Sequence, residues 1–85
     1  MAHTVNETVD VITACQSSSH HKLVPKVMHW HNQTYTFTRL GLRHPTKLGR
    51  RMVHVFDMAD DSHCFRLEFD AESLLWTLRS VSDGL

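Results

Sequence analysis

The alternation of apolar and polar residues around two tryptophans constrains the fold of this chain more than any other feature of the sequence. In the segment MHWHNQTYTF, residues 28–37, apolar residues occupy alternate positions on both sides of Asn32-Gln33. A period of two is typical of a β-strand with one buried face, because successive side chains of a strand point to opposite sides. We therefore expect a hairpin with a two-residue turn at Asn32-Gln33. Its register pairs Trp30 with Tyr35, Met28 with Phe37, His31 with Thr34 and His29 with Thr36.

The second tryptophan lies in CFRLEFDAESLLWTLRSV, residues 64–81, which shows the same alternation around an expected loop at residues 70–73. The expected pairs are Phe69 with Leu74, Leu67 with Trp76 and Phe65 with Leu78. A helix over residues 71–83 is the alternative, since Asp70 is a typical N-cap residue. That helix would turn Trp76 toward solvent, so we favour the strand.

A further strand is expected between the two hairpins. The segment RRMVHVFDM, residues 50–58, is rich in β-branched and aromatic residues. It lies between two expected loops, HPTKLG at residues 44–49 and ADDS at residues 59–62. Gly41 indicates a β-bulge, because the apolar alternation changes phase at that position.

The first strand is expected at residues 8–13, where β-branched residues dominate. A helix that starts at the capping box Thr4–Glu7 is the alternative. The sequence as a whole predicts one all-β domain over residues 1–85, with about six short antiparallel strands in a meander that forms a small barrel or half-barrel. We expect residues 1–7 and 83–85 to be frayed.

The hairpin and the last strand also carry a resemblance. The motif P-x-x-x-x-W-x-x-x-x-Y occurs as Pro25, Trp30 and Tyr35, and it is followed by FRLEFDAESLLWTL near the C-terminus. These motifs resemble those of small uncharacterised bacterial β-domains of unknown function, which share the tryptophan–tyrosine hairpin and a last strand of the form F-D-x-x-x-x-x-W-x-L. The resemblance covers roughly residues 9–82 and implies a β fold. It implies no activity, cofactor or site residue.

Composition and motifs argue against several classes of protein. No apolar run approaches the roughly 20 residues that a membrane-spanning helix requires. The polar start MAHTVNETVD is not a secretory signal, so we expect a cytoplasmic protein that does not contact membranes. The chain has 3 glycines and neither a phosphate-binding loop nor a serine-nucleophile motif. We therefore expect no enzymatic activity and no cofactor.

Charge divides the sequence into two blocks. Residues 21–54 contain seven Lys or Arg residues and no acid, whereas residues 55–85 contain seven acids and two arginines. Such a division indicates either a basic binding face or strands that pair across the two blocks. The densest basic segment is RLGLRHPTKLGRR, which we expect to cluster around one long loop. Its candidate residues for binding nucleic acid or an acidic protein partner are Arg39, Arg43, Lys47, Arg50 and Arg51.

Histidine is frequent, with 8 residues in a chain of 85. His29 and His31 are expected side by side on the polar face of one strand, as a pair of metal ligands would be. Zinc needs three or four ligands, however, and no other His or Cys stands at a diagnostic spacing. A solvated pair is therefore the preferred interpretation, and a metal-binding protein centred on these two residues is a further hypothesis.

Together these patterns predict a non-enzymatic binding or interaction module. The alternative is a nucleic-acid-binding barrel that uses the basic residues 39–51. The aromatic residues weigh against that alternative, because the strand patterns place them in the core rather than on a stacking surface. The isoelectric point of about 7.1 predicts self-association near neutral pH, where the net charge is close to zero.

Overall fold

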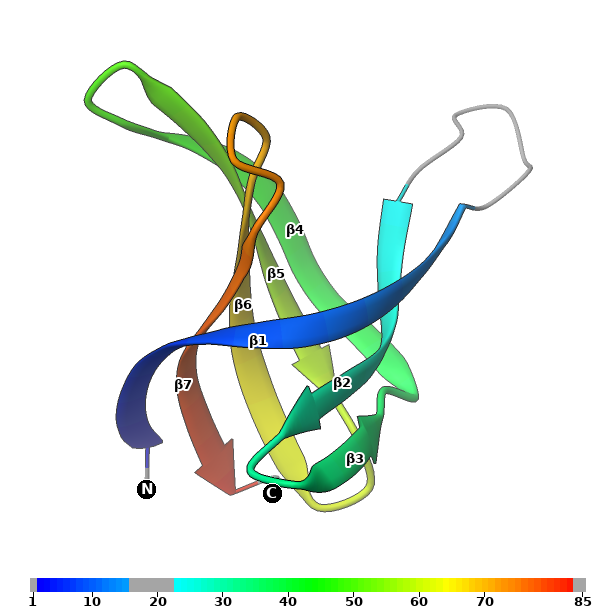
Figure 1. Ribbon diagram of the computed structural model, residues 1–85. Helices are drawn as coiled ribbons and strands as arrows, with labels where there is room; N and C mark the ends of the chain where they lie inside the picture. Colours follow the sequence, from blue (N-terminus) through cyan, green and yellow to red (C-terminus); the bar gives the residue numbers. More distant parts are fainter. Residues whose placement is uncertain (1, 16–22, 84–85) are drawn as a thin grey trace.

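Backbone pairing joins seven strands into one antiparallel sheet in the part of the chain that the structure describes, residues 2–15 and 23–83. The structure is a computed structural model (Figure 1). The strands are β1 (Ala2–Cys15), β2 (Leu23–Trp30), β3 (Gln33–Thr36), β4 (Arg39–Leu48), β5 (Arg51–Ala59), β6 (His63–Asp70) and β7 (Trp76–Asp83). Their order in the sheet is β3-β2-β1-β7-β6-β5-β4. These residues form no helix, and the all-β prediction is confirmed.

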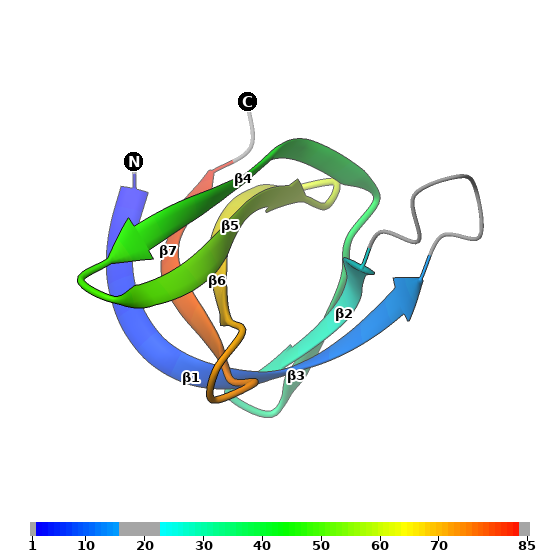
Figure 2. The same ribbon diagram turned by 90° about the horizontal axis from the view of Figure 1, so that it is seen from above.

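The sheet curls into a half-barrel whose two end strands are β3 and β4 (Figure 2). The link between these strands crosses from one end of the sheet to the other. In this link the Phe37 N–H donates to the Lys26 carbonyl at 2.8 Å, and the Thr38 N–H donates to the Ala59 carbonyl at 2.8 Å. The link ties the two ends together, although β2 and β4 form no ladder with each other among the described residues.

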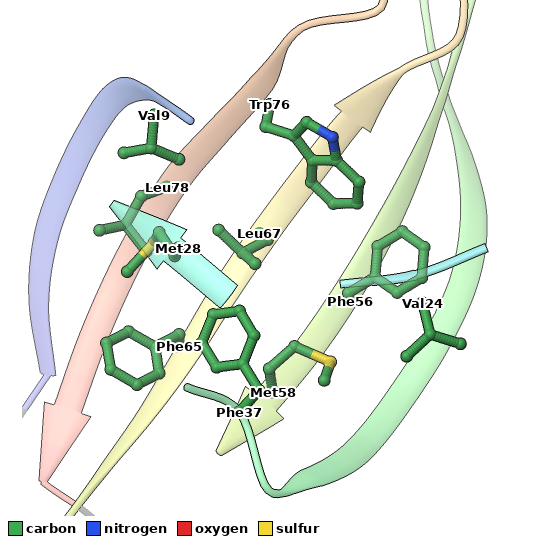
Figure 3. Close-up of a cluster of buried hydrophobic side chains, with 10 residues drawn as sticks. All are labelled: Val9, Val24, Met28, Phe37, Phe56, Met58, Phe65, Leu67, Trp76 and Leu78. Carbon is green, nitrogen blue, oxygen red and sulfur yellow. The ribbon is translucent and has the colours of Figure 1, made fainter. Parts of the chain in front are cut away.

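The concave face of the sheet carries the hydrophobic core (Figure 3). Its 10 buried side chains are Val9, Val24, Met28, Phe37, Phe56, Met58, Phe65, Leu67, Trp76 and Leu78. The Trp76 ring lies 5.3 Å from the Phe56 ring and 4.9 Å from the Phe69 ring, between centroids. Trp30 and Tyr35 are half-buried and pack against the same cluster. The prediction that the aromatic residues belong to the core is therefore confirmed.

The strand that the sequence did not predict is β4, which raises the number from about six to seven. The loop expected at residues 44–49 is wrong, because β4 continues to Leu48 and the turn comprises only Gly49 and Arg50. Gly49 has a φ of 65°, as the first central residue of a type II′ hairpin turn requires. Pro45 fits into β4 because β4 is an edge strand. On the open side of an edge strand, a missing N–H removes no hydrogen bond between strands.

The expected bulge at Gly41 is confirmed. The β4–β5 register shifts between Leu40 and Leu42, which leaves Gly41 as the extra residue. A Cβ atom at Gly41 would lie 3.2 Å from the Asp57 carbonyl oxygen, which is a tight approach. The glycine therefore permits β4 to bend while it stays close to β5.

The N-terminal strand is longer than expected. β1 spans Ala2–Cys15 rather than residues 8–13, and it pairs with β7 along its first part and with β2 along its second. Residues 2–7, which were expected to fray, belong to this strand, and the helix expected as the alternative is wrong. Asp83, also expected to fray, is the last residue of β7 and pairs with His63. Residues 1, 84 and 85, also expected to fray, lie outside the described residues.

The turn of the β2–β3 hairpin lies at His31-Asn32 rather than at Asn32-Gln33. The two residues have φ values of 51° and 61°, which is the conformation of a type I′ turn. His and Asn adopt positive φ more readily than Gln does, so Gln33 begins the next strand. The observed pairs are Met28 with Tyr35, His29 with Thr34 and Trp30 with Gln33. Each partner is two residues from the expected one, which keeps every side chain on its expected face.

The β6–β7 connection also differs from the expected loop at residues 70–73, because β7 starts only at Trp76. The observed pairs are Phe69 with Trp76, Leu67 with Leu78 and Phe65 with Val81. The helix considered for residues 71–83 is wrong, and the strand is confirmed. Leu74, expected on the core face, lies in the connection with a φ of 63° and is 67% exposed.

Candidate anion-binding hairpin

All five basic residues that the sequence singled out lie on the β4–β5 hairpin. Its strands and turn span residues 39–59, and no acid occurs before Asp57. The last β5 residue that pairs with β6 is Val53, opposite Asp70. Beyond that pair the hairpin extends from the rest of the sheet as a two-stranded ribbon (Figure 1). The basic residues were expected around a long loop, but they lie on a hairpin of two paired strands.

The register places Arg43 and Lys47 on the concave face of the hairpin, Arg43 where β5 still pairs with β6 and Lys47 in the two-stranded extension. Arg43 lies directly opposite Phe56, whose side chain is in the core, and Lys47 lies opposite Met52. Residues opposite each other in an antiparallel pair point to the same side of the sheet. Since Arg43 and Lys47 are four residues apart on one strand, their side chains share that face.

The other three basic residues do not join them. Arg39 lies opposite Ala59, on the convex face, and Arg50 lies in the turn. Arg51 forms an ion pair with Asp70 of β6. The structure thus brings Arg43 and Lys47 together, sets Arg50 at the tip beyond them, and separates Arg39 and Arg51 from that face.

Arg43 has an unusual environment. Its Cζ atom lies 5.3 Å from the centroid of the Phe56 ring, within the range of a cation–π contact. Its Nη1 atom is buried and has no hydrogen-bond partner among the described residues. A guanidinium has five N–H donors and no acceptor, so this nitrogen keeps an unused hydrogen-bonding capacity.

Two arginines on the convex face of β6 and β7 form ion pairs. Arg66 donates to both carboxylate oxygens of Asp57, at 2.8 and 3.1 Å, and the hydrogen bond and charge of Asp57 raise the pKa of Arg66. Arg79 lies 3.0 Å from Glu68. Together with the pair that Arg51 forms, these contacts offset three acids of the second charge block. Pairing across the two blocks is therefore limited to Arg51 and Asp70 in the described part of the chain.

The other cations of the basic block that the structure describes have no such partners. Among the described residues, no acid forms an ion pair with Lys26, Arg39, Arg43, Lys47 or Arg50. All except Arg43 are exposed. The β4–β5 hairpin therefore presents uncompensated positive charge, whereas Arg66 of β6 and Arg79 of β7 are paired with acids.

The two histidines considered as metal ligands are not side by side. His29 lies on β2, where its Nδ1 atom is 3.1 Å from the Thr34 hydroxyl. His31 lies in the turn, stacked on Trp30 at 4.3 Å between centroids, with Nε2 at 3.2 Å from a Glu7 carboxylate oxygen. The expectation that they share one strand face is wrong, because the turn begins at His31. The described residues contain no group of three or more His, Cys, Asp or Glu side chains that could hold a metal ion.

The sequence reasoning missed two elements of this site. One is Lys26, which lies across the open side of the half-barrel from β4 and lines the same hollow as Arg39. The other is the free backbone edge of β4. A signal for the second was present, since a proline in an otherwise strand-like segment indicates an edge strand.

Comparisons with protein-family models, with curated proteins and with solved structures gave no match. The resemblance to small bacterial β-domains therefore stays a prediction. Among the described residues, no helix is long and apolar enough to cross a membrane.

Proposed function

We propose that this domain is a non-enzymatic binding module of the cytoplasm, which binds an acidic protein segment through the β4–β5 hairpin. The observation that carries the proposal is the unpaired charge of the hairpin beside β6 and β7, whose arginines are paired with acids. Arg43 adds a buried nitrogen without a partner. An acidic segment would supply the carboxylates that this surface lacks, and charge-assisted hydrogen bonds to Arg are among the stronger polar contacts.

Two features favour an acidic polypeptide over a single-stranded nucleic acid. No Phe, Trp or Tyr side chain is among the large apolar residues exposed in the described part of the chain, so a platform for stacking bases is lacking there. The net charge of the chain is zero, and acids such as Asp61 and Glu72 are exposed elsewhere on the molecule. A long phosphate backbone would meet these acids, whereas a short acidic segment can lie on the hairpin alone.

The proposal predicts that a labelled oligo-glutamate peptide binds the protein at low salt. We expect the double variant Lys47→Gln/Arg50→Gln to bind it roughly three- to tenfold more weakly, because two exposed ion pairs contribute up to about 1 kcal/mol each. Fluorescence anisotropy measures both affinities, and raising the salt concentration should weaken binding to the unmodified protein more than to the variant.

The matched control changes the net charge equally but on another strand. Thr4→Glu/Thr8→Glu places two negative charges at exposed positions of β1, which is separated from β4 by three strands of the sheet. We expect less than a twofold effect. Equal losses in both variants, or no binding by the unmodified protein, would overturn the proposal. Tighter binding of an oligothymidine of equal length, lost in the hairpin variant, would assign the surface to nucleic acid instead.

A further inference from the structure

We propose that the acidic segment binds as an added antiparallel β-strand along the open edge of β4, with its acids at every second position. This inference rests on the proposed function and specifies how that same hairpin recognises its partner. It depends on the backbone of β4, on the spacing of its cations and on a hollow at the start of the strand.

The backbone of β4 is available for pairing. β4 is the last strand of the sheet order, and within the described residues it pairs only with β5. Pro45 lies opposite His54 and has no N–H to donate to it. The two residues therefore form a non-hydrogen-bonded pair, in which the backbone polar groups of each residue point away from the partner strand. Arg43 and Lys47 share that orientation, because orientation repeats at every second residue. Their N–H and C=O groups therefore face the open edge, and Pro45 removes only one donor from it.

Arg43 and Lys47 lie four residues apart on β4, at two of these outward-facing positions, with Pro45 between them. The side chains of Arg43 and Lys47 lie on the concave face, at the positions whose backbone groups face outward. A strand added antiparallel to this edge would place its own residues directly opposite them, on the same face. Acids at alternate positions of that strand would thus meet Arg43 and Lys47, whereas acids at adjacent positions would point to opposite faces.

A hollow of about 210 Å³ lies between β2 and the beginning of β4. The buried side chains of Val24, Phe37 and Met58 line it, together with Leu40, which is 44% exposed. Lys26 and Arg39 also line it. This hollow offers an apolar contact between two cations, which suits the end of a bound acidic segment.

A second copy of this chain is a poorer occupant of the edge. Two β4 strands that pair antiparallel around Pro45 would place Arg43 of one copy opposite Lys47 of the other. Like charges directly opposite each other destabilise a strand pair. Cations and proline on an edge strand are features that prevent pairing between identical copies, so charge complementarity selects an acidic strand.

The test compares peptides of equal composition, each about ten residues long, the length of a long strand. One alternates Glu and Thr, and the other is Glu-Glu-Glu-Glu-Thr-Thr-Thr-Thr-Glu-Thr, in which no two Glu residues lie four positions apart. We expect the alternating peptide to bind about tenfold more tightly, because only it can place acids opposite both cations while its backbone pairs with β4. In the alternating peptide, N-methylation of the Glu residues should abolish this advantage, since their N–H groups face β4. N-methylation of the Thr residues should change the affinity less than twofold.

The outcomes separate this inference from the proposed function. Equal affinity for the two peptides, or equal effects of the two methylation patterns, would overturn strand addition and leave charge-based binding in place. No binding of either peptide, or of oligo-glutamate, would overturn the proposed function itself. A dimer seen by sedimentation without peptide, and dissociated by the alternating peptide, would show that a second copy occupies the edge and would also overturn the inference.

Discussion

Replacing Trp76 with alanine is expected to lower the free energy of unfolding by about 3–5 kcal/mol. Trp76 is 7% exposed and lies with Phe56 on the concave face (Figure 3). It also packs against Phe69. Removing the indole leaves a cavity beside these two rings, which costs stability in addition to the lost apolar burial. Because small domains are stable by only about 5–15 kcal/mol, the variant should be largely unfolded at moderate temperature.

Thermal and urea unfolding followed by circular dichroism measure this effect. Leu75→Ala is the control, since Leu75 directly precedes Trp76 but is 53% exposed. We expect the control to change the free energy of unfolding by less than about 0.5 kcal/mol. A Trp76→Ala variant that keeps the original melting temperature would contradict the assignment of this residue to the core.

Replacing Asp70 with alanine is expected to cost about 2–3 kcal/mol of stability. Asp70 is the buried polar residue of the described core, at 8% exposure. Its carboxylate accepts the N–H groups of Glu72 at 2.8 Å and Ser73 at 3.3 Å, and it forms an ion pair with Arg51. Alanine would leave both N–H donors without their acceptor and would loosen the connection that sets the β6–β7 register.

Asp70→Asn separates the two contributions, because asparagine keeps an acceptor oxygen but loses the charge. We expect its cost to be about 1 kcal/mol. The free energies of the two variants come from urea unfolding. If Asp70→Asn and Asp70→Ala were equally destabilised, the ion pair with Arg51 would carry the stability and the N–H contacts would not.

The sequence predicted the faces of the strands better than their partners. Around both tryptophans, the alternation of side chains places Met28, Tyr35, Leu67 and Leu78 correctly on the core side. Next to each turn the pairing differs by two residues, because turn geometry determines which residues face each other. At Phe65 it differs by three, because the β6–β7 register shifts between Arg66 and Leu67. The β2–β3 turn depends on the ability of His31 and Asn32 to adopt positive φ, and alternation contains no information about that.

β4 was missed for a related reason. Pro45 and Gly49 are typical of loops, and both lie in or next to a strand here. An edge position accommodates a proline whose nitrogen faces outward, and a type II′ turn requires the glycine. Whether a strand lies at an edge follows from the order of strands, which depends on contacts between residues far apart in the sequence.

The candidate site was predicted as a set of residues but not as a surface. The five cations were identified from their density along the chain. That density could not show that Arg51 is paired with Asp70, or that Arg39 and Arg43 lie on opposite faces. The bulge at Gly41 lies between Arg39 and Arg43. In a regular strand, residues four apart lie on the same face, but the extra residue of the bulge puts these two on opposite faces.

Amide chemical shifts of the isotope-labelled protein, recorded while the alternating Glu-Thr peptide is added, test the central claim most directly. Binding along the open edge of β4 predicts that the largest shift changes are those of the Arg43 and Lys47 amides, whose N–H groups would gain new acceptors. Amides of β1 such as those of Thr4 and Thr8 should hardly change. Shift changes centred on β1 or β3, or of similar size in every strand, would contradict the claim that the β4–β5 hairpin is the binding surface.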